Sequence, residues 1–95
     1  MSPIKQKKLK KLRNQLDKLD NSLIKLIKKR TEIVKKVLDL KDYKKQIVDK
    51  KRIKFILNRI KRKSLKNKID PKITNRIWKN MIWSYIDYER RKFKK

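Results

Sequence analysis

Two cations of this chain, Arg30 and Lys41, have types and a spacing suited to holding a small anion. If the segment between them is one helix, their side chains lie about 20° apart around its axis and about 16 Å apart along it. A guanidinium group pairs with a carboxylate through two parallel charge-assisted hydrogen bonds, and an ammonium group adds a compact positive charge. The pair therefore indicates a site for a small polyanion.

Further ionisable residues can join this group. Arg13 points about 100° away from Arg30 on the same helix, so it can reach the same ligand only from a partner chain. Glu89 continues the apolar line of a later helix, which predicts a buried acidic side chain. Arg52 lies beside Asp49 in the first turn of a further helix and adds another cation to the group.

Each of these residues also has a plain structural interpretation. Arg30 interrupts a stripe of leucine and isoleucine, where a polar residue can set the register of a coiled coil. Lys41 can be a solvated charge at a helix end, Arg52 an exposed basic residue, and Glu89 the partner of a surface lysine. Taken together, these ionisable residues favour a binding site for an anion, because a buried cation without an anion is costly.

A long helix must position Arg30. Apolar residues follow one another in steps of three and four from Leu9 to Leu40, and neither glycine nor proline interrupts them. The pattern predicts a helix over about 4–41, about 50 Å long at 1.5 Å per residue, whereas a compact chain of this size has a radius of gyration of about 12 Å. We expect a second copy of the chain to cover the overhang, in an intertwined helical homodimer.

Two shorter helices follow a connection at 42–48. Asp49 is an N-cap for a helix over about 49–65, whose apolar stripe is Ile53, Ile56, Leu57 and Ile60. Asp70 and Pro71 begin a helix over about 70–93, whose apolar side is Ile73, Ile77, Trp78, Met81, Ile82, Tyr85 and Ile86. The expected fold is all-α, with three helices in a single domain over 1–95.

The composition excludes several kinds of chemistry. The chain has no cysteine and no histidine, so it can build neither a disulfide, nor a Cys/His metal site, nor an imidazole catalyst. It has no glycine either, which removes phosphate-binding glycine loops. No segment reads as a secretion signal or a membrane span. We therefore expect no metal, no cofactor, no membrane partner and a cytoplasmic location.

The net charge of +25 is a second indication of anionic partners. Lysine clusters can bind a phosphate backbone, so a nucleic-acid-binding basic helical protein is one alternative. The lysines, however, are scattered over the outward-facing helix positions, and no aromatic stacking platform or helix-turn-helix spacing accompanies them. Non-specific nucleic-acid binding is compatible with the sequence, but a dedicated nucleic-acid function is not favoured.

The first helix resembles a known family. The run "LRNQLDKLDNSLIKLIKKR", followed by Lys41, is similar to the first helix of the all-α (AroQ-class) chorismate mutases. The segments "VDKKRIKFILNRI" and "IDPKITNRIWKNMIWSYIDYE" are similar to the second and third helices of that family. The resemblance implies a homodimer that rearranges chorismate to prephenate in the biosynthesis of phenylalanine and tyrosine, an isomerase reaction.

The resemblance also implies roles for the candidate residues. Arg13 of the partner chain and Arg30 would hold the two carboxylates of chorismate, and Lys41 would bind a carboxylate and the ether oxygen. Asp49 and Arg52 would close the site, and Glu89, in its protonated form, would be the second donor to the ether oxygen.

One difference from many bacterial members leaves an alternative open. Ile53 stands where they carry a glutamate that contacts the substrate hydroxyl. The related isochorismate pyruvate lyases, which form salicylate, have an aliphatic residue there and a tyrosine at the position of Tyr85. Tyr85 is therefore a further candidate for substrate binding, and isochorismate is the alternative substrate.

Overall fold

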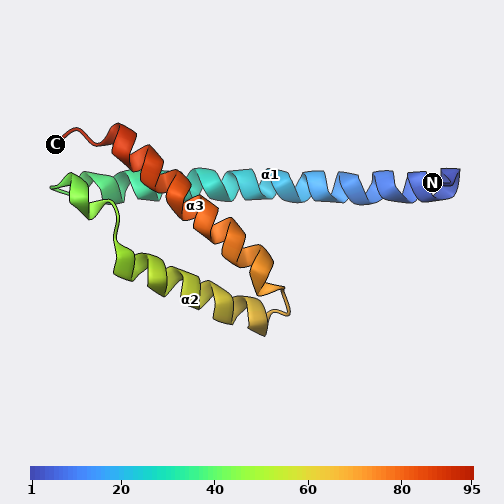
Figure 1. Cartoon of the computed structure of the whole chain (residues 1–95). Coiled ribbons are helices and arrows are strands. Elements are labelled where there is room, and N and C mark those ends of the chain that lie inside the picture. Colours follow the sequence, from blue (N-terminus) through green and yellow to red (C-terminus); the bar gives the residue numbers. More distant parts are fainter. The chain divides into compact units, whose positions relative to one another are not determined.

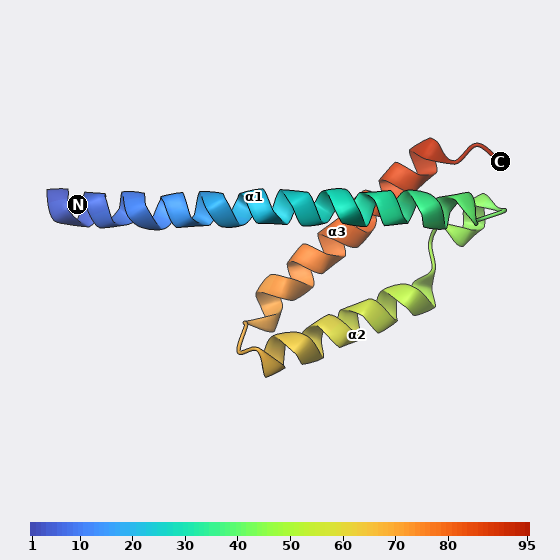
Figure 2. The same ribbon diagram turned by 180° about the vertical axis from the view of Figure 1, so that it is seen from behind.

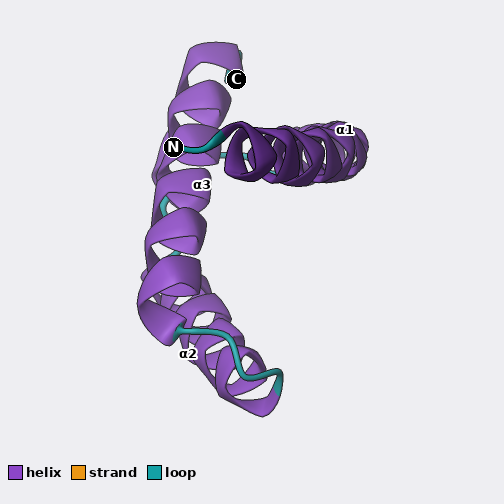
Figure 3. Cartoon of the chain, turned by 90° about the vertical axis from the view of Figure 1, so that its right-hand side faces the viewer, coloured by secondary structure: helices purple, strands orange, loops and turns teal.

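The computed structural model describes all residues, 1–95. Three α-helices and one short 3₁₀ helix follow one another, and no strand is present (Figure 3): α1 (Pro3–Asp39), η1 (Lys44–Gln46), α2 (Lys50–Lys66) and α3 (Pro71–Lys92). The predicted all-α fold with three helices is confirmed, and each predicted helix end lies within two residues of the observed one. None of the helices has an apolar stretch long enough to cross a membrane.

Contacts divide the chain into two compact units, Met1–Ile33 and Val34–Lys95. The first unit consists almost entirely of α1, which runs without a break in Figure 1. The apolar stripe of this unit is open to solvent, with side chains between 54% and 61% exposed at Leu12, Leu16, Leu19, Leu23, Leu26 and Ile33. An apolar stripe of this length is a surface that another helix can cover.

The second unit contains the end of α1, η1, α2 and α3. Its core is aliphatic, and half-buried Val48, Ile53, Leu57, Trp78 and Phe93 pack against it; the buried members are Leu38, Ile47, Ile56, Ile60, Ile82 and Ile86. Most of the apolar side predicted for the second and third helices is thus in the core. Ile73 and Ile77 differ, because they remain 56% and 51% exposed in the first turns of α3.

Helices α2 and α3 lie side by side and run in opposite directions (Figures 1 and 2). At the end of α2, the amides of Lys68 and Ile69 donate to the carbonyls of Leu65 and Ser64, a pairing typical of helix C-termini. Lys68 has a φ of 57°, in the left-handed region that favours glycine. As predicted, Asp70 then caps α3, accepting a hydrogen bond from the amide of Lys72 at 2.9 Å.

The end of α1 corrects one expectation. The helix stops at Asp39, and the amides of Leu40 and Lys41 donate to carbonyls only three residues back, at 3.1 and 3.0 Å. Such bonds tighten the last turn, so the backbone at Lys41 no longer follows the α-helix. The prediction that the chain continues as one α-helix from Arg30 to Lys41 was therefore wrong for residues 40 and 41.

Candidate active site

The centre of the candidate site is an ion pair between Lys41 and Glu89. The ammonium nitrogen Nζ of Lys41 lies 3.2 Å from Oε1 and 3.3 Å from Oε2 of the Glu89 carboxylate. The side chain of Glu89 is only 6% exposed and that of Lys41 is 19% exposed. The predicted catalytic residues are Arg30, Lys41 and Glu89, and the structure brings the last two together.

Glu89 is buried because of its place on α3. It follows Ile82 and Ile86 on the face that packs into the core, and it is itself 5% exposed, as its position in the apolar line predicted. A buried carboxylate without a partner would be costly, and Lys41 provides the opposite charge at hydrogen-bonding distance. The fold therefore holds an acid and an ammonium group in contact at the edge of an aliphatic core.

The segment that carries Lys41 is fixed by polar contacts. Oε1 of Gln46 accepts hydrogen bonds from the amides of Asp42 and Tyr43, at 2.7 and 2.9 Å. Nζ of Lys95 donates to the carbonyl of Lys41 at 3.0 Å and, on the other side of the lysine, to the carbonyl of Asp39. The backbone of Lys41 is thus held from both sides in a segment that contains no glycine and no proline.

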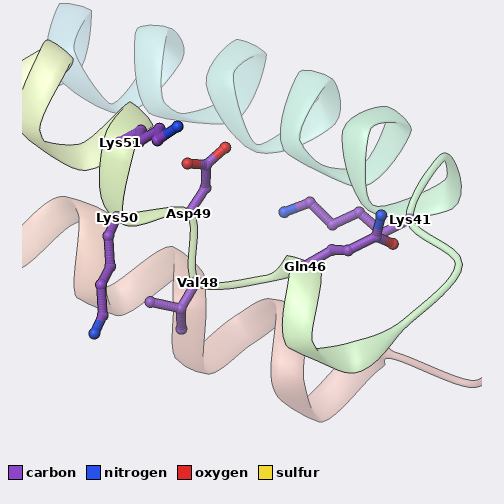
Figure 4. Close-up of a pocket in the computed structure, with 6 residues that line it drawn as sticks. All are labelled: Lys41, Gln46, Val48, Asp49, Lys50 and Lys51. Carbon is purple, nitrogen blue, oxygen red and sulfur yellow. The ribbon is translucent and has the colours of Figure 1, made fainter.

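An open pocket of about 630 Å³ lies beside this segment, lined by Lys41, Gln46, Val48, Asp49, Lys50 and Lys51. In Figure 4 the Lys41 side chain extends across the pocket in the direction of the Asp49 carboxylate. Three ammonium groups and one carboxylate give the wall a net positive charge, which suits an anionic ligand. Asp49 thus lines the same pocket as Lys41.

Asp49 and Arg52 meet through a helix cap. Oδ1 of Asp49 accepts a hydrogen bond from the backbone amide of Arg52 at 3.0 Å, which fixes the first turn of α2. The guanidinium group of Arg52 lies 5.2 Å from the centre of the Phe55 ring. Arg59 stacks on the same ring, at 5.8 Å. The charged end of Arg52 therefore rests on an aromatic face, exposed to solvent, and no ion pair joins it to Glu89.

The remaining candidates lie elsewhere along the helices. Arg13 and Arg30 both belong to the part of α1 in the first unit, where Arg13 is exposed and Arg30 is half-buried. Tyr85 lies on α3, one turn before Glu89, and is half-buried. The roles of these three residues stay predictions.

Sequence reasoning missed Gln46 and Lys95. A glutamine at the third position of a helix can bond back to the cap residue, but here the cap residue is Tyr43, which is not a usual capping type. Lys95 is one of many lysines, and its contact with the end of α1 spans more than fifty positions of sequence. The signal that could have found Gln46 is a glutamine at the third position of a helix, whatever the type of the cap residue.

Comparison with known proteins identifies the class to which this fold and site belong. The family model for chorismate mutase type II matches residues 12–90, most of the chain. The chain therefore belongs to the chorismate mutase type II family, and the resemblance seen in its sequence is confirmed. No curated protein and no solved structure matches the chain.

Proposed function

We propose that this chain catalyses the rearrangement of chorismate to prephenate. The observation that carries the proposal is the contact between Lys41 and Glu89 in a chain of this family, because it places an ammonium group and a carboxyl group side by side at a basic pocket. Chorismate is a dicarboxylate with an ether oxygen, and the rearrangement breaks the bond at that oxygen. Donors aimed at this oxygen stabilise the charge that it gains.

The chemistry agrees with the residue types in the chain. The rearrangement is an intramolecular pericyclic step, so it needs neither a nucleophile nor an imidazole base, and the chain has no cysteine and no histidine. Acceleration then comes from holding the reactive conformer and from charge complementary to the transition state. Both contributions depend on fixed cations rather than on a reactive side chain.

Lys41 and Glu89 have coupled roles in this proposal. A carboxylate of the substrate competes with Glu89 for the ammonium group of Lys41, which then also donates to the ether oxygen. Glu89, at 5% exposure, would lose its counter-ion and remain buried, and a buried lone carboxylate is costly. Glu89 in its protonated form would then be a hydrogen-bond donor to the ether oxygen.

Asp49, Arg52 and Tyr85 have further proposed roles in substrate binding. Asp49 shares the pocket with Lys41, and Arg52 follows Lys50 and Lys51 in the first turn of α2. Arg52 is exposed, so its guanidinium group can turn from the Phe55 ring to a substrate carboxylate at small cost. Tyr85, one turn before Glu89, would contact the substrate ring.

The proposed site also needs a second copy of the chain. The open stripe of leucines on α1 supports a homodimer in which two copies of this helix pack together. In such a dimer Arg13 of one copy and Arg30 of the other would hold the two carboxylates of one substrate. The two active sites would then be shared between the protomers.

The test is to incubate the purified chain with chorismate and, separately, with isochorismate, and to identify the products. We expect prephenate from chorismate, and a Lys41→Met chain that folds but forms prephenate at a small fraction of the rate. Salicylate and pyruvate from isochorismate, with chorismate unchanged, would instead assign the lyase reaction. Inertness toward both compounds would contradict an enzymatic role.

A further inference from the structure

The segment that carries Lys41 has no regular secondary structure to hold it. Lys41 lies beyond the last residue of α1, and the neighbouring Leu40 is 81% exposed. Between α1 and α2 the chain contains no proline, which would restrict the backbone, and no glycine. The position of a lysine on such a segment depends on individual contacts of its neighbours.

Gln46 makes two of the contacts that fix this segment. Its Oε1 accepts from two successive amides, those of Asp42 and Tyr43, directly after Lys41. Bonds of 2.7 and 2.9 Å to a single oxygen determine how the chain turns away from the lysine. Figure 4 shows the Gln46 side chain extending from η1 back toward Lys41.

Gln46 is itself anchored to the core. Its amide donates to the carbonyl of Tyr43 at 3.0 Å, and the amide of Ile47 donates to the carbonyl of Lys44 at 3.1 Å, which closes the turn of η1. Ile47 follows at once and is 4% exposed in the aliphatic core. A continuous series of contacts therefore runs from the core through Ile47 and Gln46 to the backbone beside Lys41.

We propose that Gln46 is a positioning residue for the reaction: its side-chain oxygen holds the segment after Lys41 so that Nζ stays aimed at Glu89 and the pocket. This inference rests on the proposed function, because it presumes that Lys41 acts on the substrate. Small displacements of a catalytic group cost large factors in rate, so the two hydrogen bonds of Gln46 control the turnover without contact with the reacting atoms.

The test separates the oxygen of Gln46 from the bulk of its side chain. Gln46→Leu removes the acceptor and keeps the size, whereas Gln46→Glu keeps an oxygen that can accept from both amides. We expect Gln46→Leu to lower kcat/KM roughly ten- to a hundredfold and Gln46→Glu to keep most of it. Lys44→Gln, in the same turn, changes the charge by the same amount as Gln46→Glu and serves as its matched control.

Two further measurements distinguish positioning from a general loss of structure. In a Lys41→Met chain, Gln46→Leu should cost little additional activity, because its effect passes through Lys41. In the otherwise unchanged chain, Gln46→Leu should speed hydrogen exchange at the amides of Asp42 and Tyr43 and leave exchange in the α2 and α3 helices unchanged.

Several results would overturn the inference. A Gln46→Leu chain with the kcat/KM of the wild type would do so. An equal loss of activity when Gln46→Leu is introduced into the wild-type chain and into the Lys41→Met chain would do so as well. A loss in Gln46→Glu as large as that in Gln46→Leu, with full activity in Lys44→Gln, would show that the acceptor is not what matters. If the wild-type chain left chorismate unchanged, the proposed function would fail by itself. Unaltered hydrogen exchange at the amides of Asp42 and Tyr43 in Gln46→Leu would still show that Gln46 does not hold the segment.

Discussion

At the scale of single residues, the Lys41–Glu89 pair is better explained by chemistry than by stability. Removing two charges from water costs free energy that their attraction only partly returns, so a pair as buried as this one adds little net stability. Its contribution should instead appear in the reaction. Activity and folding can therefore be separated by substitutions at Glu89.

The first prediction concerns Glu89. If the Glu89 side chain donates a hydrogen bond to the ether oxygen, an amide at the same position can donate in its place. Glu89→Gln keeps a donor, so it should retain activity. Glu89→Ala should lose roughly a hundredfold or more in kcat, the usual cost of one oxyanion donor.

The measurement is kcat for chorismate, with circular dichroism to verify that the variants remain folded. A loss in Glu89→Gln as large as that in Glu89→Ala would mean that a donor at this position is not what matters. Full activity in Glu89→Ala would remove Glu89 from the site.

The sequence predicted where the backbone of two site residues, Glu89 and Asp49, lies in the fold. The helical period places a Cβ atom, so it located Glu89 in the core and Asp49 at the start of α2. The helical period does not show where the end of a long side chain lies. It therefore did not predict that the guanidinium group of Arg52 lies on the Phe55 ring. The contact of Lys41 with Glu89 links residues 48 positions apart, which no local pattern specifies.

At the scale of elements, helix starts were easier to predict than helix ends. Asp49 and the Asp70–Pro71 pair are specific start signals, and both caps form as expected. The usual end signal is glycine, and this chain has none. The end of α2 is formed instead by Lys68, at a φ of 57°.

The second prediction follows from that angle. A residue with a Cβ in the left-handed region is strained by of order 1 kcal/mol, and glycine avoids this strain. Lys68→Gly should therefore raise the free energy of unfolding by about 1 kcal/mol, or the Tm by about 4 to 8 °C for a chain of this size. Thermal unfolding followed by circular dichroism measures both.

Lys63→Gly, one turn earlier inside α2, is the matched control for Lys68→Gly. It removes the same side chain from a residue with helical backbone angles, so it should destabilise the chain by about 1 kcal/mol. Destabilisation by both substitutions would show that Lys68 is not strained.

At the scale of the whole molecule, the open stripe of α1 is the main evidence for a second copy. Its period and length predicted that something must cover it, and the structure leaves it exposed within one chain. The nature of the cover does not follow from the stripe alone, because leucine side chains pack against many apolar surfaces. For this reason the homodimer stays a proposal that needs its own test.

The third prediction uses the shared sites of that dimer. Arg13→Ala and Arg30→Ala chains should each be nearly inactive, because every site of either homodimer lacks one arginine. After mixing under conditions that exchange subunits, the heterodimer has one site with both arginines intact. The kcat/KM per total chain should then recover in part.

Mixtures of each variant with itself, treated in the same way, control for the exchange procedure. Mixtures of the two variants that stay as inactive as the parents, despite subunit exchange verified by mass spectrometry, would contradict shared sites.

The fourth prediction concerns the net charge of +25. A strongly basic surface attracts a dianionic substrate from a distance, and salt screens that attraction. We expect kcat/KM to fall with rising ionic strength more steeply than kcat, in a series from low to about 0.5 M salt at constant pH. Parallel changes in both constants would mean that the surface lysines take no part in substrate capture.

The exposed stripe of α1 also bears on how long a single copy survives. Helices gain most of their stability from packing, so an α1 without a cover opens more often than one that is packed. This helix is rich in lysine, and every opened turn offers bonds that a trypsin-like protease cleaves. Unpaired copies should therefore be degraded first, and dilution should shorten the lifetime of the chain.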